Sequence, residues 1–299
     1  MKKDLPDFLI VGAAKCGTTS LGDYLNTHKD MFICNPKEPK FLTYSFLKDC
    51  YRGKGDDFTK KKAVKSLEEY KSLFKKAKPN QLKGESSVDL LYYHDKSIPL
   101  IKEIIGDPKI IIMLRNPSKR AFSAYSHLVR DGREDKSYIE ALKLEDERRK
   151  LDYEFIWSYK NAGYYSDSTK AFLDNFTNVK VIIFEEFVKN QENVVKEVLK
   201  FLGTDNQPSN FTELHRNISG KSKSQLLNRI LLKDSFVKTI FKKILPNNTR
   251  SKIKFLIQKT NTKPIIIEDY ERDYLKGVFN DDINELQNIL DTDLSIWKQ

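Results

Sequence analysis

The sequence begins with a strand, a glycine-bearing loop and a helix, in the order that an anion-binding site requires. The apolar run Phe8–Ala13 predicts a buried strand, and Thr19–Thr27 predicts the helix that follows it. We call the connecting residues 12–20, Gly-Ala-Ala-Lys-Cys-Gly-Thr-Thr-Ser, the phosphate loop. Unpaired backbone N–H groups at the start of such a helix point at a bound anion. The sequence therefore predicts a phosphate site, against the alternative of an ordinary strand-to-helix turn with an exposed Lys15.

The phosphate loop departs from the pattern of nucleotide kinases. Its glycine spacing equals that of a P-loop, but Thr18 stands where the usual lysine would be, and Lys15 comes three residues earlier. A kinase also needs an acid near the end of a neighbouring strand to hold Mg²⁺. The strand predicted over Lys109–Leu114 is followed instead by a cation, Arg115. We therefore expect phosphate to be bound directly, without a metal ion.

A second phosphate contact is predicted just after that strand, in the sequence Arg-Asn-Pro-Ser-Lys-Arg-Ala-Phe-Ser that ends at Ser123. Asn116 suits the N-cap of a helix and Pro117 its first position, so Arg115 should lie at the carboxyl end of the strand. Ligands bind at that edge of open parallel sheets. The Arg115 guanidinium can hold a phosphate through two hydrogen bonds, and Ser123 can add a hydroxyl donor. The alternative is a salt bridge from Arg115 to a nearby acid, with Ser123 a neutral surface residue.

Short apolar strands alternate with longer helical stretches along the chain. Another strand is expected over Val179–Phe184, followed by a helix over Gln191–Leu202 that ends at Gly203. Uninterrupted hydrophobicity indicates strands buried on both faces, which is typical of a parallel sheet covered by helices. Hydrophobic residues make up 39% of the 299 residues, enough for a sizeable core. We expect one α/β domain over residues 1–299, with a P-loop-like central parallel sheet flanked by helices.

Composition excludes several classes of protein. No apolar run approaches the ~20 residues that span a bilayer, and the three cysteines show neither a disulfide framework nor a metal-ligand spacing. The apolar run after Asp7 is interpreted as a strand rather than a signal peptide, because acids interrupt its basic start. The net charge is +11, and the segment 229–263 alone carries ten basic residues and one acid, with apolar residues at helical spacing among them. We expect an anionic small ligand rather than nucleic acid, and no bound metal.

Two of these segments together resemble the sulfotransferases that use 3′-phosphoadenosine 5′-phosphosulfate (PAPS). The phosphate loop looks like their 5′-phosphosulfate-binding loop, and Leu114–Ser123 is similar to their 3′-phosphate-binding motif. The similarity is closest to the carbohydrate branch, which includes bacterial and heparan-type enzymes. It implies a PAPS-dependent sulfotransferase. Shorter matching segments lie at residues 84–87, 163–165, 183–187, 201–203 and 293–297, leaving 229–263 unaccounted for.

The resemblance assigns roles to individual residues. Lys15 matches the lysine that stabilises charge on the departing phosphate, and Glu38, in a Lys-Glu-x-x-Phe context, matches the proposed base for the acceptor hydroxyl. Because Pro39 disfavours a helical conformation at Glu38, we expect this acid on a stiff extended segment. Arg115 and Ser123 would hold the 3′-phosphate of PAPS. The other expected cofactor contacts are Lys15, Cys16, Gly17, Thr18, Thr19 and Ser20 in the phosphate loop, and Lys221 and Lys223 in a late basic loop.

The acceptor side departs from the heparan enzymes. Lys40 stands where they often carry histidine, and Ser86 stands where they tend to have lysine after Glu85. Lys40, Glu85 and Ser86 are thus the expected acceptor contacts, and the acceptor is expected to be a hydroxyl of a carbohydrate or glycoconjugate. The basic segment 229–263 is a candidate contact with an acidic acceptor, a glycolipid or a membrane surface.

Other side chains with chemical potential are assigned structural roles. Cys16 is expected to be a packing residue, because no covalent sulfur intermediate is needed. His94 is expected to cap a helix or lie on the surface rather than act as a base, and Tyr164 and Tyr165 are expected in the core.

Two other functions stay open: a P-loop kinase using ATP and Mg²⁺, and a protein that binds polyanions or membrane surfaces. Thr18 and Arg115 disfavour the kinase, and the binding protein does not explain the two phosphate motifs. Because the first strand starts so near the N-terminus, we expect a cytoplasmic enzyme of the soluble bacterial type, or a Golgi-lumen enzyme if an anchor has been removed.

Overall fold

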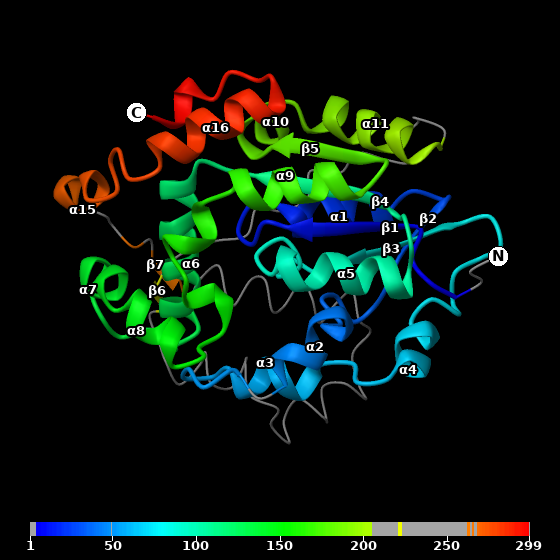
Figure 1. Cartoon of the computed structure of the whole chain (residues 1–299), viewed down its shortest axis with the longest axis horizontal. Helices are drawn as coiled ribbons and strands as arrows, with labels where there is room; N and C mark the ends of the chain where they lie inside the picture. Colours follow the sequence, from blue (N-terminus) through cyan, green and yellow to red (C-terminus); the bar gives the residue numbers. More distant parts are fainter. Residues whose placement is uncertain are drawn as a thin grey trace.

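Five parallel strands form the centre of the computed structural model (Figure 1). The structure describes residues 4–48, 50–204, 221–222, 262–263, 265 and 268–298. The strand order is β2-β3-β1-β4-β5, and every neighbouring pair runs parallel. The strands are β1 (Phe8–Gly12), β2 (Met31–Ile33), β3 (Leu82–Ser86), β4 (Lys109–Leu114) and β5 (Val179–Ile183).

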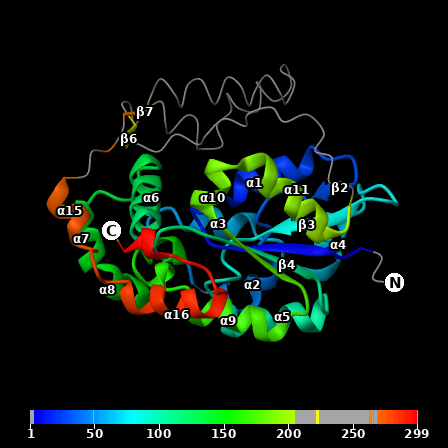
Figure 2. The same ribbon diagram turned by 90° about the horizontal axis from the view of Figure 1, so that it is seen from above.

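The central strands are buried on both faces, as their continuous hydrophobicity predicts. All five residues of β1 are buried, and β4 is buried from Ile110 to Leu114. Helices cover both faces of the sheet: α1 (Thr18–Asn26), α10 (Phe184–Lys189) and α11 (Gln191–Leu202) lie over one face, and α5 (His94–Ile104), α9 (Ser166–Asn175) and α16 (Asn280–Leu290) over the other (Figure 2). The expected α/β architecture with a P-loop-like parallel sheet is confirmed.

The phosphate loop separates β1 from α1, whereas α6 (Pro117–Arg130) and α10 begin within three residues of the ends of β4 and β5. The described α-helices are α1 (Thr18–Asn26), α2 (Phe41–Leu47), α3 (Asp57–Lys62), α4 (Leu67–Ser72), α5 (His94–Ile104), α6 (Pro117–Arg130), α7 (Tyr138–Lys143), α8 (Glu145–Lys150), α9 (Ser166–Asn175), α10 (Phe184–Lys189), α11 (Gln191–Leu202), α15 (Asp269–Asp273) and α16 (Asn280–Leu290). The described 3₁₀ turns are η1 (Phe155–Trp157), η2 (Asn161–Gly163) and η3 (Ser295–Trp297).

The predicted element bounds agree with the structure to within one residue. The strand β4 and the helix α11 have the predicted bounds, and Gly203 ends α11 with a left-handed φ of 87°. The strands β1 and β5 each end one residue earlier than predicted, and α1 runs one residue ahead of its predicted bounds at both ends. The segment 229–263 lies outside the described residues except for Thr262–Lys263, which forms β7 and pairs antiparallel with β6 (Lys221–Ser222). No helix in the described parts of the chain is both long and apolar enough to cross a membrane.

Candidate active site

The phosphate loop connects the buried end of β1 to the start of α1, and its backbone is arranged for anion binding. Gly17 takes the N-cap position of α1 with φ of 91°, a conformation that favours glycine. A Cβ at Gly17 would also lie 2.8 Å from the ring of Phe184, so no larger residue fits there. No side chain caps the helix, and in the described part of the chain the amides of Gly17, Thr18 and Thr19 are not taken up by the turn and loop hydrogen bonds around them. The start of α1 therefore offers unpaired N–H groups and the positive end of the helix dipole.

Arg115 lies at the carboxyl end of β4, directly beside the phosphate loop. Its Nη1 donates a hydrogen bond to the carbonyl oxygen of Lys15, 3.3 Å away, and its guanidinium carbon lies 4.7 Å from the centroid of the Phe184 ring. Its Nε is buried and has no hydrogen-bond partner. No described acid pairs with Arg115, so the structure gives no support to the alternative of a salt bridge. A planar cation with an unused donor is suited to bind a phosphate.

The helix α6 places Ser123 on the same side as Arg115. Asn116 is its N-cap and accepts a hydrogen bond from the amide of Lys119, with Pro117 in the first helical position, as the sequence predicts. The Asn116 side-chain amide in turn donates to the carbonyl oxygen of Trp297, 3.1 Å away. The Trp297 indole and the Asn116 backbone amide both donate to Glu185. Three segments that are far apart in the sequence thus meet at the start of α6 and fix its position.

One cavity of about 640 Å³ brings most of the predicted site residues together. It lies at the carboxyl edge of the sheet, where parallel sheets bind ligands. The predicted site residues among those that line it are Lys15, Gly17, Thr18, Thr19, Ser20, Glu38, Arg115 and Ser123.

Cys16 of the phosphate loop is among the expected cofactor contacts, but its side chain does not line this cavity. It is fully buried, with its Sγ 3.9 Å from the hydroxyl of Tyr165. Burial raises the pKa of its thiol to about 11. These surroundings are those of an inert packing residue, as predicted.

Lys15 lines the cavity and has a pKa well below the usual value of a lysine. Its backbone is left-handed, with φ of 73°. Burial and then the charge of Arg130 lower its pKa to about 8, while Asp131 and Glu38 act in the opposite direction. Lys15 therefore stands among other cations, where a bound anion would be favoured.

Glu38 lies on the segment between β2 and α2 and lines the same cavity as the phosphate loop. Its carboxylate is 3.7 Å from the Nζ of Lys37 and 3.6 Å from the Nζ of Lys40, and about a third of its side chain is exposed. Its φ is 54°, so the predicted extended conformation at this residue is wrong. The amide of Glu38 donates to the carbonyl oxygen of Ser86 at the end of β3, and this bond holds the turn in place against the preference set by Pro39.

The three predicted acceptor contacts do not reach the cavity. Lys40, Glu85 and Ser86 have exposed fractions of 4%, 0% and 1%. Burial raises the pKa of Glu85 to about 7, and its carboxylate accepts hydrogen bonds from the hydroxyls of Tyr70 and Ser87. The prediction that these three side chains touch an acceptor is therefore not supported, because packing of the segment between β2 and α2 onto β3 encloses them.

Lys40 instead forms a buried ion pair beneath Glu38. Its Nζ lies 3.2 Å from Asp89, whose side chain is fully buried. Burial lowers the pKa of Lys40, but the carboxylates of Asp89 and Glu38 outweigh it and raise the pKa above its usual value. Lys40 therefore stays protonated and forms an ion pair with the carboxylate of Glu38 as well.

Other residues line the cavity that the sequence did not single out. Lys37 donates to the Oγ1 of Thr19 at 2.5 Å, and burial lowers its pKa. His127 lies one helical turn after Ser123 on α6, so helical spacing was the signal that could have found it. Burial, followed by the charges of Lys15 and Arg130, lowers the pKa of His127 well below its usual value, which keeps it neutral.

A charged cluster contributes two more residues to the lining of the cavity. Arg133 bridges Asp56 and Glu154, with Nη2 2.9 Å from the Glu154 carboxylate. Arg133 and Glu154 line the cavity, whereas Asp56 is fully buried and accepts a hydrogen bond from the Trp157 indole. This cluster could not be predicted from the sequence, because its members come from three separate segments.

The predictions for the two tyrosines, His94 and the late basic loop have different outcomes. Tyr165 is buried as predicted, but Tyr164 is 44% exposed and packs only its ring against Phe279, so the prediction that it lies in the core is wrong. His94 is the first residue of α5 and lines a different, smaller cavity. Lys221 belongs to β6, which lies beside α6, but its side chain is outside the described residues, as is all of Lys223. Both stay predictions.

The sheet, the phosphate loop and the cavity at the carboxyl edge of the sheet together define a P-loop-like α/β protein. Comparison with known proteins agrees. The family described as "Sulfotransferase domain" matches residues 5–235. The crystal structure of a sulfotransferase from Alicyclobacillus acidocaldarius aligns with a TM-score of 0.77 and 32% identity, over 98% of this chain and 99% of that one. The chain belongs to the sulfotransferase domain family.

Curated relatives are more distant and longer. The heparan sulfate glucosamine 3-O-sulfotransferase 3B1 of Mus musculus is 26% identical over 206 residues, which are 67% of this chain and 47% of that protein. The bifunctional heparan sulfate N-deacetylase/N-sulfotransferase 1 of Caenorhabditis elegans is 30% identical over 145 residues, 48% of this chain and 15% of that protein. The chain thus spans about half, or less, of the length of these relatives.

Proposed function

We propose that this protein transfers a sulfuryl group from PAPS to a hydroxyl of a carbohydrate or glycoconjugate. The observation that carries the proposal is the single cavity onto which the phosphate loop, Arg115, Ser123 and Glu38 all open. This supports the proposal, because the same cavity offers groups suited to two phosphates and a carboxylate suited to the acceptor hydroxyl, as an in-line transfer requires.

The residues present fit PAPS. The uncapped start of α1 and the Nε of Arg115 are two sets of donors without partners, and each suits one phosphate. Gly17, Thr18 and Thr19 would donate to the 5′-phosphate, and Arg115 and Ser123 would hold the 3′-phosphate. When bound, PAPS supplies a sulfuryl group whose leaving group is the 5′-phosphate of the nucleotide.

Glu38 would act on the attacking hydroxyl of the acceptor, and Lys15 would act on the departing phosphate. Glu38 accepts the proton of the acceptor hydroxyl while that oxygen forms a bond to sulfur. The bond from sulfur to the bridging oxygen breaks, its electron pair stays on the phosphate, and Lys15 stabilises the charge that develops there. Lys37, which bonds to Thr19, adds a second cation near the same phosphate.

The acceptor class is supported by the relatives and by the cavity. Two of the relatives are named as heparan sulfate enzymes. Arg133 and Glu154 line the cavity and provide one donor group and one acceptor group for a hydroxylated ligand.

The test compares two nucleotides on the same protein. Thermal-shift titration with 3′-phosphoadenosine 5′-phosphate (PAP) should raise the melting temperature, while ATP with Mg²⁺ should do so less. Transfer of labelled sulfate from PAPS to a panel of neutral and acidic oligosaccharides then identifies the acceptor. Stabilisation by ATP with Mg²⁺ in preference to PAP would favour the kinase and overturn the proposal.

The roles of the two reacting residues are tested with variants that keep their size. Glu38→Gln and Lys15→Met should each lower kcat by about 10²-fold or more. PAP binding should survive in Glu38→Gln, which shows that the variant is folded. Full activity in Glu38→Gln would remove Glu38 as the base.

A further inference from the structure

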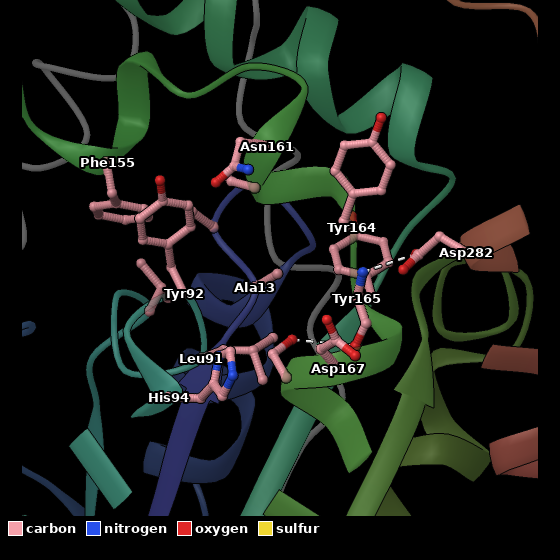
Figure 3. A pocket seen from close by; sticks show the side chains of 14 residues that line it. Ala13, Leu91, Tyr92, His94, Phe155, Asn161, Tyr164, Tyr165, Asp167 and Asp282 are labelled. Atoms are coloured by element: carbon pink, nitrogen blue, oxygen red, sulfur yellow. Dashed lines mark hydrogen bonds between the residues drawn. The ribbon is translucent and has the colours of Figure 1, made fainter. Parts of the chain in front are cut away.

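A second cavity, of about 170 Å³, lies between the phosphate loop and the first residues of α5 and α9 (Figure 3). Ala13 and Ala14 of the phosphate loop form part of its wall. Ala14, Val88 and Phe155 line both this cavity and the larger one, so the two cavities are adjacent. Nothing in the proposed mechanism uses this second cavity.

Aromatic rings form two sides of this pocket. Tyr92 and Phe155 lie next to each other on one side, with ring centroids 5.6 Å apart and planes tilted by 40° (Figure 3). Tyr164, which is 44% exposed, lies on the other side (Figure 3). These rings do not form a parallel slot of the kind that would sandwich a flat base. All three rings line the hollow.

Three polar side chains with free hydrogen-bonding capacity lie around the same hollow. The Nδ1 of His94 is buried and has no partner. The backbone amide of Asn161 is held by Glu145 at 2.7 Å, and its side-chain amide lines the pocket (Figure 3). Asp167 adds a carboxylate from the first turn of α9. The three come from α5, η2 and α9, and they lie on different sides of the pocket (Figure 3).

The charge of this pocket is opposite to that of the larger cavity. Asp167 and Asp282 line it, and no lysine or arginine is among its lining residues in the described chain. Asp282 accepts hydrogen bonds from the amides of Tyr165 and Ser166 and from the Ser166 hydroxyl, so its side chain is fixed in place. A phosphate, sulfate or carboxylate ligand would meet like charges here and would be disfavoured.

We propose that this pocket is a subsite for one neutral sugar ring. Its aromatic walls suit the apolar C–H faces of a sugar, and a sugar presents hydroxyls around its whole rim. A hydroxyl can donate to the Asp167 carboxylate and accept from the Asn161 amide. It can also bond to the Nδ1 of His94, whether that nitrogen is a donor or an acceptor. The role of this subsite rests on the proposed function: the bound sugar would be a unit of the acceptor glycan other than the one that is sulfated.

The experiment uses a matched pair of ligands that differ only in charge. Saturation-transfer NMR on the full chain compares methyl β-D-glucopyranoside with methyl β-D-glucuronide, whose ring is the same but carries a carboxylate. The neutral glycoside should bind at millimolar concentration, and the glucuronide should bind at least 10-fold more weakly. Equal binding of the two, or no binding of the neutral glycoside, would overturn the proposal.

Variants locate the binding. Asp167→Ala and, independently, Asn161→Ala should each weaken binding of the neutral glycoside at least 10-fold. The control Asp174→Ala, two turns further along the same helix and not among the residues that line the pocket, should leave it unchanged. Melting temperatures show that each variant is folded. Glycoside binding that is unchanged in both pocket variants would place the ligand elsewhere and sink the idea. Adenosine binding that depends on Asp167 would do the same, since it would mark a nucleobase pocket.

These measurements need neither PAPS nor turnover. Their failure would leave the sulfotransferase proposal standing, because that proposal depends on PAP binding and sulfate transfer. Conversely, a chain that does not bind PAP could still bind the neutral glycoside. The two proposals can therefore fail separately.

Discussion

The guanidinium of Arg120 donates from Nε to the carbonyl oxygen of Ala14 in the phosphate loop, at 3.2 Å. Arg120 is fully buried, and its Nη1 donates to the carbonyl oxygens of Ser158 and Tyr159 at 3.1 and 3.0 Å. In the described part of the chain its partners are therefore carbonyl oxygens, without a carboxylate. A buried cation that is balanced only by dipoles is costly unless a nearby anion compensates it. The phosphate of a nucleotide in the neighbouring loop would be such an anion.

Arg120→Met should consequently weaken both the fold and nucleotide binding. Three carbonyl oxygens lose their donors, which costs about 3 kcal/mol of unfolding free energy. The phosphate loop also loses its tether at Ala14, so we expect the Kd for PAP to rise about 10-fold or more. Chemical denaturation and calorimetric titration measure the two effects, with Arg149→Met on the exposed face of α8 as the control. A stable Arg120→Met variant with unchanged PAP affinity would show that the tether does not matter.

Arg115 should discriminate the two phosphates of the nucleotide. Arg115→Met removes the donor fork assigned to the 3′-phosphate, so the Kd for PAP should rise about 10²-fold. Adenosine 5′-monophosphate lacks that phosphate, and its Kd should change by less than about 3-fold. Ser123→Ala should give a smaller change in the same direction. Equal losses for both nucleotides would mean that Arg115 supports the whole site rather than the 3′-phosphate.

The lowered pKa of Lys15, about 8, predicts a limit of activity on the alkaline side. Lys15 is charged below that pH and neutral above it, and only the charged form stabilises the departing phosphate. We therefore expect kcat/KM, which reports the free enzyme, to fall as the pH rises above about 8. Lys15→Arg, which stays charged, should shift this limb to higher pH even if its rate is low.

A bound phosphate would raise the pKa of Lys15, because an opposite charge favours the protonated form. PAP binding at pH 8.5 should therefore take up as much as about one proton. Calorimetry in buffers of different ionisation enthalpy measures this uptake, and Lys15→Met should abolish it. Uptake that persists in the variant would assign the proton to another group.

The local parts of the site could be read from the sequence, and the non-local parts could not. The phosphate loop, Arg115 and Ser123 lie in continuous motifs whose conformation is set by the strand before them and the helix after them. By contrast, Trp297 reaches Asn116 from the far end of the chain, and no periodicity connects the two. The hydrogen bond from Glu38 to Ser86, which turns the backbone of Glu38, also depends on packing between separate segments.

Arg120 is an intermediate case. It stands in a basic stretch beside Lys119, which is exposed, and a basic residue is ordinarily expected to be solvated. However, Arg120 precedes the buried residues Ala124 and Leu128 at intervals of four. This spacing places all three on one face of α6, so helical periodicity alone could have indicated that the cation points inward.

The buried pair of Lys40 and Asp89 should separate stability from catalysis. Lys40→Met leaves the fully buried Asp89 without its cation and should lower the unfolding free energy by about 3 kcal/mol. It also removes one of the two lysines that hold Glu38, so we expect kcat to fall about 10-fold while the Kd for PAP stays unchanged. The double variant Lys40→Met/Asp89→Asn removes both buried charges but keeps an acceptor for Thr43, so most of the stability should return. If kcat also returned to the original value in the double variant, Lys40 would matter only for the fold and would not position the carboxylate of Glu38.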